Sequence, residues 1–260
     1  MFKILKYSFF DLMRSRWSYV YFLFYLILGF VLLFLNNDVS KAVITLMNVI
    51  IILVPLISTI FGVMYYYNSK EFTELLLAQP IKRSSIFMGQ FLGVSGSLLL
   101  SLVLGLGIPF ISYGLFKSSA IFDFSLLLAV GSFLTIIFTV LSFNIAISNE
   151  NKIKGFGYAV LLWLFMAVIY DGLFLMSLIV FEEYPLDTFS IAATMFNPID
   201  LSRTLILLKL DISALLGYTG AVFKSFFGTN LGLIISLLIL TLWVVLPIWR
   251  LVIKALKKDF

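Results

Sequence analysis

The chain alternates between long apolar runs and short polar connections. Six of the runs are long enough, at roughly 20 residues, to cross a hydrocarbon layer about 30 Å thick as α-helices. None alternates between apolar and polar residues at every second position, as the strands of a membrane barrel do. The pattern therefore predicts an all-α integral membrane protein, a single domain over residues 1–260, with six transmembrane helices at residues 17–35, 42–66, 90–115, 123–147, 156–181 and 230–253.

The polar connection at residues 68–89 differs from the others because it predicts a helix of its own. Phe72, Leu75 and Leu76 have helical spacing and would share one face, with the two glutamates of the stretch pointing elsewhere. Pro80 cannot continue that helix. We expect a short amphipathic helix here. An ordinary helical cytoplasmic loop and a docking site for a partner both fit this pattern.

The first sixteen residues predict a second amphipathic helix, which leads into the first span. Its apolar side chains fall on one helical face, and its basic side chains fall mostly elsewhere. This is typical of an interfacial helix in the inner head-group layer. No small-residue cleavage signature follows the first apolar run, so we expect a retained span rather than a signal peptide. The apolar face comprises Phe2, Leu5, Phe9, Leu12 and Met13.

Residues 182–228 form a connection too long for a simple loop and too apolar to be disordered. Apolar residues recur at helical spacing after the turn-forming pair Asn197-Pro198, and again after Asp211. We expect at least two short helices that form a small extracytoplasmic cap before the sixth span. The two apolar sets are Leu201, Leu205 and Leu208, and then Ile212, Leu215 and Leu216.

Composition and charge support the membrane assignment and predict its orientation. The chain is 62% hydrophobic and 12% charged, whereas a soluble protein has roughly 25% charged residues. Of the 18 Lys and Arg residues, 13 fall on the side that carries both termini and residues 68–89, and five fall on the other. The positive-inside rule therefore predicts cytoplasmic termini. The net charge of +5 lies next to the spans, where anionic lipid head groups would meet it, so no nucleic-acid partner is expected.

The absence of Cys and His restricts the chemistry available to this chain. It has no thiolate or imidazole ligand for a metal and no Cys-based or His-based catalytic site. The eight Met residues are scattered, which favours packing over copper binding. The segment at residues 217–225 lacks the spacing of a phosphate-binding loop. We expect no cofactor on this chain, no enzymatic activity, and a partner that supplies energy if the protein does work.

Asp171 is the ionisable residue that the pattern places well inside the hydrocarbon. An unpaired carboxylate there costs several kcal/mol, so it should be protonated, hydrogen-bonded or in a polar cavity. With no Lys or Arg predicted inside the membrane to pair with it, a coupling role and a role in helix or subunit contacts both stay open. Asn48 and Asn144 are weaker intramembrane polar candidates, more typical of hydrogen bonds between helices.

The stretch from Glu71 to Gly89 resembles the cytoplasmic signature of the ABC type-2 permeases, with an acidic residue, a run of leucines, a proline, an arginine and a glycine at the third span. Six spans and the N-terminal amphipathic helix match that family over the whole length. Phe72 stands where the family has Gly, and Gln90 where it has Lys. The resemblance implies a homodimer that docks two cytoplasmic ATPase subunits, which bind ATP and Mg. The implied coupling residues are Glu71, Phe72, Glu74, Leu75, Leu76, Pro80 and Arg83.

Within that family, the chain is similar to the NosY-like permeases of nitrous-oxide reductase maturation, on the basis of Tyr170-Asp171-Gly172 and the motif Asn197-Pro198-x-Asp200-x-x-Arg203. This similarity implies a bacterial inner-membrane protein with a NosF-like ATPase and a NosD-like periplasmic β-helix protein as partners. It implies that ATP-driven motion is transmitted to the periplasmic partner during copper-site maturation. We expect Asn197, Pro198, Asp200 and Arg203 to dock that partner.

Two other functions fit the same sequence. One is an ABC exporter permease that moves a lipid-like or drug-like amphiphile. The other is an energy-independent membrane anchor or secondary transporter. A Walker-type ATPase encoded next to this chain would exclude most of the latter class, and a neighbouring periplasmic β-helix protein would favour transmission over export.

Overall fold

The computed structural model describes residues 1–36, 38–118, 120–181, 184, 186–210 and 220–257. In these residues the fold is helical and contains no strand. Six of the described helices are long and apolar enough to span a membrane, which confirms the predicted number. They are α2 (Arg16–Asn36), α3 (Val39–Asn68), α5 (Arg83–Ser112), α6 (Ile121–Ser148), the fifth span Lys152–Val180, and α12 (Asn230–Lys257).

The fifth span is not a uniform α-helix. It consists of α7 (Lys152–Leu164), a π-helical turn η2 (Phe165–Ile169) and α8 (Tyr170–Val180). The backbone N–H of Tyr170 donates to the carbonyl of Phe165, five residues earlier, which is the π-helical pattern. The turn comes directly before Tyr170 and Asp171, so it sets the direction in which these two side chains leave the helix.

The third span begins earlier than its sequence pattern predicts, at Arg83 rather than near Gln90. Short helices accompany the spans: α1 (Phe2–Arg14), α4 (Lys70–Leu77), η1 (Leu115–Lys117), α9 (Asp187–Phe196), α10 (Pro198–Lys209) and α11 (Gly220–Phe227). The second apolar set predicted for the long connection, Ile212, Leu215 and Leu216, lies outside the described residues together with Asp211.

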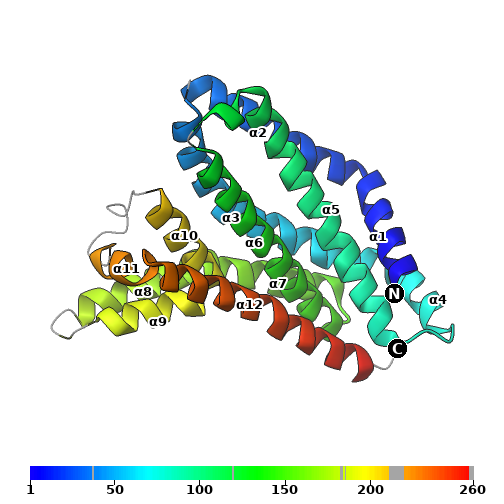
Figure 1. Ribbon diagram of the computed structural model, residues 1–260. Coiled ribbons are helices and arrows are strands. Elements are labelled where there is room, and N and C mark those ends of the chain that lie inside the picture. The colour runs from blue at the N-terminus through cyan, green and yellow to red at the C-terminus, as the bar shows by residue number, and fades with distance from the viewer. Residues whose placement is uncertain (37, 119, 182–183, 185, 211–219, 258–260) are drawn as a thin grey trace.

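The core forms where α3 packs along α6 and where α5 packs against α1 and α2 (Figure 1). Two glycines of α5 allow the close approach. A Cβ at Gly93 would lie 2.6 Å from Ser8 Cβ and 2.8 Å from the Leu5 carbonyl oxygen of α1. A Cβ at Gly105 would lie 2.8 Å from Tyr25 Cβ of α2. Glycine at these positions therefore lets three helices meet almost backbone to backbone.

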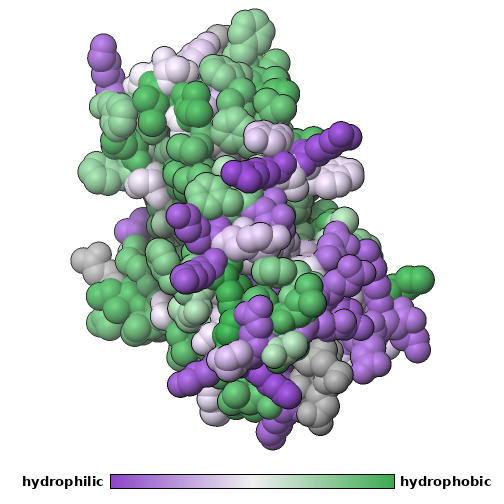
Figure 2. Space-filling model, turned by 90° about the vertical axis from the view of Figure 1, so that its right-hand side faces the viewer, coloured by the Kyte–Doolittle hydropathy of each residue, from purple (hydrophilic) through white to green (hydrophobic). Residues whose placement is uncertain are grey.

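The start of α1, the end of α12 and the whole of α4 lie at the same end of the helix bundle (Figure 1). Figure 2 looks onto this end and shows many hydrophilic side chains gathered on it. This arrangement agrees with the grouping of basic residues along the sequence. The assignment of this end to the cytoplasm stays a prediction of the positive-inside rule.

The described part of the long connection before the sixth span is mostly helical, as predicted, but α9 and α10 are more deeply placed than a surface cap. The chain turns by 116° between them, so it folds back instead of continuing across. The Asn197 side chain donates to the Met166 carbonyl, near the midpoint of the fifth span. The Trp243 indole, near the midpoint of α12, donates to the Met195 carbonyl at 3.2 Å. The turn is therefore level with the middle of two spans, which is the arrangement of a re-entrant hairpin.

Candidate functional site

Helix α4 is held to the bundle by two contacts of different kinds. The Phe72 ring stacks on the Tyr7 ring of α1, with ring centroids 4.5 Å apart. Thr73, the next residue, is buried and accepts a hydrogen bond from the Gln90 side chain of α5 at 2.8 Å. Gln90 is fully buried, so this bond is made in a water-poor environment and fixes α4 relative to α5.

The outer face of α4 carries two acidic residues and one leucine. Glu71, Glu74 and Leu75 are all exposed, and Leu75 keeps 69% of its surface accessible. Lys70 lies 3.8 Å from Glu74 in an exposed pair, which contributes little to stability. We call Glu71, Glu74 and Leu75 the α4 outer face. It offers an apolar contact beside negative charge at the end of the bundle.

This arrangement corrects the predicted division of α4. The sequence placed Phe72, Leu75 and Leu76 together on an uncovered face and the glutamates elsewhere. In the structure Phe72 and Leu76 are partly buried, and Leu75 lies with the glutamates. The reason is that α1 packs along α5 and covers the side of α4 that Phe72 occupies. Local spacing does not reveal that a distant segment covers one face.

The remaining predicted coupling residues lie in the turn after α4. Pro80 is exposed and stands between the two helices, where the Ile81 N–H donates to the Gln79 carbonyl at 2.7 Å. Arg83 is exposed and opens α5. Pro80 and Arg83 therefore lie close to the α4 outer face along the chain. Their role in coupling stays a prediction.

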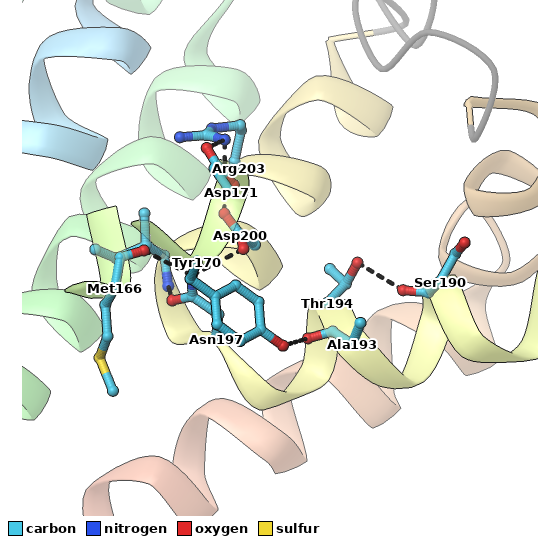
Figure 3. Close-up of polar contacts among 10 residues, drawn as sticks. Met166, Tyr170, Asp171, Ser190, Ala193, Thr194, Asn197, Asp200 and Arg203 are labelled. Atoms are coloured by element: carbon cyan, nitrogen blue, oxygen red, sulfur yellow. Dashed lines mark hydrogen bonds and ion pairs between the residues drawn. The ribbon is translucent and has the colours of Figure 1, made fainter. Parts of the chain in front are cut away.

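A second polar cluster joins the fifth span to the re-entrant hairpin (Figure 3). Arg203 Nη1 of α10 lies 2.5 Å from Asp171 Oδ2 of α8 and 3.5 Å from Asp200 Oδ1. The Asn197 amide donates to Asp200 Oδ2 at 2.8 Å and to the Met166 carbonyl at 2.7 Å. We call Asp171, Asn197, Asp200 and Arg203 the hairpin cluster.

Local structure positions each member of the hairpin cluster. Asn197 is the N-cap of α10, and its side-chain oxygen accepts from the Ile199 N–H at 3.1 Å. Pro198 occupies the first helical turn, where its missing N–H costs nothing. Asp200 and Arg203 follow at positions three apart and so project from one face of α10. The π-helical turn brings Asp171 opposite that face.

The cluster explains how ionisable groups are tolerated next to apolar helices. One guanidinium lies between two carboxylates, and each side chain that is taken from water gains a charged hydrogen bond or ion pair. The side chains of Asp171 and Arg203 keep 29% and 28% of their surface exposed, whereas Asp200 is buried. Removing the guanidinium would leave two carboxylates close together with no positive charge between them.

The pairing of Asp171 overturns one sequence expectation. The pattern indicated that no basic side chain inside the membrane could pair with Asp171, because Arg203 was assigned to an outer cap. The hairpin instead brings Arg203 inward to the depth of the fifth span. The sequence feature that could have predicted this pair is Asp171 itself, because an intramembrane carboxylate needs a cationic or hydrogen-bonding partner.

Most of the residues predicted to dock an outer partner are buried by contacts within this chain. Asn197, Pro198 and Asp200 are buried, and Arg203 is partly exposed. The docking role stays a prediction, and of these four residues Arg203 is the most exposed. The geometry assigns the motif a first task inside the fold, which is to fasten the hairpin to the fifth span.

The two intramembrane asparagines have different surroundings. Asn144 of α6 donates to the Pro247 carbonyl of α12 at 2.8 Å, so it joins two helices as expected. Asn48 of α3 is exposed on the surface of the chain. Within the described residues, no group of three or more Asp or Glu side chains is arranged to hold a metal ion.

Comparisons with known proteins identify no family for this chain. No protein-family model matches the sequence, and no curated protein matches it.

Proposed function

We propose that this chain is the non-enzymatic permease subunit of an ABC transporter of the type-2 class. It would act as a homodimer that receives ATP-driven motion from two cytoplasmic ATPase subunits. The observation that carries the proposal is the α4 outer face: an exposed leucine beside two exposed glutamates, on a short helix fastened to the bundle at its hydrophilic end.

The contacts of α4 supply a route for mechanical force. A push on α4 acts on α1 through the Phe72–Tyr7 stack and on α5 through the Gln90–Thr73 hydrogen bond. Helix α5 packs in turn against α1, α2 and α6. Because packed helices move as rigid bodies, a small displacement of α4 would tilt these helices together. A freely hanging loop would absorb the same displacement.

The hairpin cluster is suited to rearrange in response to this motion. The fifth span makes few buried contacts, and within α8 none of the described residues is buried. Its link to α10 depends on a small number of polar contacts, among them the Asp171–Arg203 pair and the Asn197 bond to the Met166 carbonyl. A few polar contacts can exchange between two arrangements more easily than an interlocked apolar core. We therefore assign the hairpin cluster to coupling rather than to catalysis.

The finer proposal is a role in copper-site maturation of nitrous-oxide reductase, as in NosY-like permeases of bacterial inner membranes. A NosF-like ATPase would bind the α4 outer face, and a NosD-like β-helix protein would bind on the opposite side of the membrane. The support for this role is the pairing of the two motif segments, Tyr170-Asp171-Gly172 and Asn197 to Arg203, in one cluster.

Isolation of the tagged full-length chain from native membranes tests the proposal. We expect an ATPase with Walker motifs to co-purify in equal number with the chain, and the complex to hydrolyse ATP. A periplasmic β-helix protein in the same complex would support the maturation role, whereas its absence together with lipid-stimulated ATP hydrolysis would favour an amphiphile exporter. A stable, ATPase-free chain would contradict the ABC assignment.

A further inference from the structure

A groove of about 670 Å³ lies between the end of α6 and the end of α12, and no residue of α4 or of the hairpin cluster lines it. One wall is a single face of α12, on which lining residues recur at helical spacing. Apolar and basic residues alternate on this face, in the order Leu246, Arg250, Ile253 and Lys257. The groove thus presents apolar side chains next to basic ones.

The basic part of the groove contains more positive charge than its own carboxylate can balance. Arg250, Lys254 and Lys257 line it together with one acidic residue, Glu150. Arg250 and Lys254 are four positions apart and Lys254 and Lys257 three, so like charges are neighbours on the helix surface. In the described part of the chain, no ion pair joins Glu150 to any of the three. An anion would relieve this repulsion.

Lys254 is held in place by the wall of the groove. Its ammonium group donates to the Asn144 carbonyl at 2.9 Å and to Ser148 Oγ at 2.5 Å. Since an ammonium has three N–H donors, one remains for a ligand. Arg250 and Lys257 are exposed and can approach a ligand from the same side. Trp249, also exposed, lines the groove where an indole ring suits a membrane–water boundary.

We propose that this groove binds one anionic phospholipid, with its phosphate at Arg250, Lys254 and Lys257 and its apolar part against Leu246 and Ile253. The apolar part of the groove favours a lipid over free phosphate, because free phosphate gains nothing from an apolar wall. The net positive lining favours an anionic head group over a zwitterionic one. The lipid would bridge α6 and α12 next to the contact that Asn144 makes with the Pro247 carbonyl.

The test is native mass spectrometry of the purified full-length chain in mild detergent, titrated with phosphatidylglycerol or phosphatidylcholine. The informative variant is Arg250→Gln with Lys257→Gln, which leaves the structural bonds of Lys254 intact. The matched control is Lys41→Gln with Lys117→Gln, which removes the same charge from exposed positions elsewhere on the chain. Thermal unfolding of both variants checks that they are folded.

We expect the first phosphatidylglycerol to bind more tightly than phosphatidylcholine, and the Arg250/Lys257 variant to lose about 25-fold in affinity, at about fivefold per basic side chain. The control variant should keep wild-type affinity. Equal binding of the two lipids, or equal losses in both variants, would overturn the proposal. Full displacement of the lipid by inorganic phosphate at matched concentration would also overturn it, because the ligand would then be a free anion.

Discussion

Arg203 pairs with Asp171 across 32 positions of the sequence, and this pair fastens the re-entrant hairpin to the fifth span. Arg203 also lies 3.5 Å from Asp200, so the guanidinium is shared between a carboxylate of its own helix and one of a neighbouring helix. The shared charge joins two elements that have few other polar contacts.

A double-mutant cycle on this pair should show strong coupling. Asp171→Asn and Arg203→Gln each break the ion pair. The double mutant should therefore lose about 1–3 kcal/mol less unfolding free energy than the sum of the two single losses. Arg203→Gln should be the more damaging single change, because it leaves two carboxylates without a cation. The measurement is denaturant unfolding in mixed micelles.

Lys209→Gln is the control for that cycle. It removes a positive charge from the same helix at an exposed position, and it should change the unfolding free energy by less than about 0.5 kcal/mol. Additive effects of Asp171→Asn and Arg203→Gln would show that the two side chains do not interact in the membrane protein.

Asn197→Ala should cost more than the loss of a helix cap alone. Asn151 provides the comparison, because it caps α7 by accepting from the Ile153 and Lys154 N–H groups and is exposed. Asn151→Ala should cost about 1 kcal/mol. Asn197→Ala should cost about 1–3 kcal/mol more, because the Met166 carbonyl and Asp200 both lose a donor.

The same unfolding assay compares the two asparagine variants. Equal losses for Asn197→Ala and Asn151→Ala would mean that Asn197 acts only as a cap, and that the hairpin turn is not fastened to the fifth span. A larger loss for Asn197→Ala would show that its bonds to the Met166 carbonyl and to Asp200 add to the cap.

Gly93→Ala should separate α1 from α5. The added Cβ would meet backbone atoms of α1, which cannot move aside as a flexible side chain can, so we expect a loss of about 1–3 kcal/mol. Gly107→Ala in the same helix meets nothing within 4 Å. This control should be neutral, or more stable by up to about 1 kcal/mol. Thermal unfolding of both variants in one detergent measures the difference, and equal stability would refute the close approach of α1.

The sequence predicts those parts of the fold that local pattern determines. The six spans follow from apolar runs long enough to cross a bilayer, and α4 and α10 follow from helical spacing bounded by Pro80 and by Asn197-Pro198. The hairpin cluster depends on a chain reversal of 116° that returns Arg203 to the depth of Asp171. No local pattern encodes that depth.

Local pattern also does not predict which residues form the α4 outer face. Spacing predicts an amphipathic helix, but the partner that covers Phe72 is Tyr7, which belongs to a segment far away in the sequence. Once α1 covers that side, Leu75 becomes the apolar residue that faces outward, beside Glu71 and Glu74. The choice of Leu75 as the residue to mutate therefore comes from tertiary packing.

If the α4 outer face docks an ATPase, as proposed, the Leu75→Asp chain should lose the ATPase during co-purification. The control is Phe116→Asp in η1, away from α4, where the side chain is equally exposed at 69%. Both variants should fold, because neither side chain is buried. We expect Leu75→Asp to reduce the co-purified ATPase and its activity at least about tenfold, because docking would bury a charge where the wild type has an apolar contact. Phe116→Asp should keep both. Wild-type amounts of ATPase with a folded Leu75→Asp chain would contradict the claim.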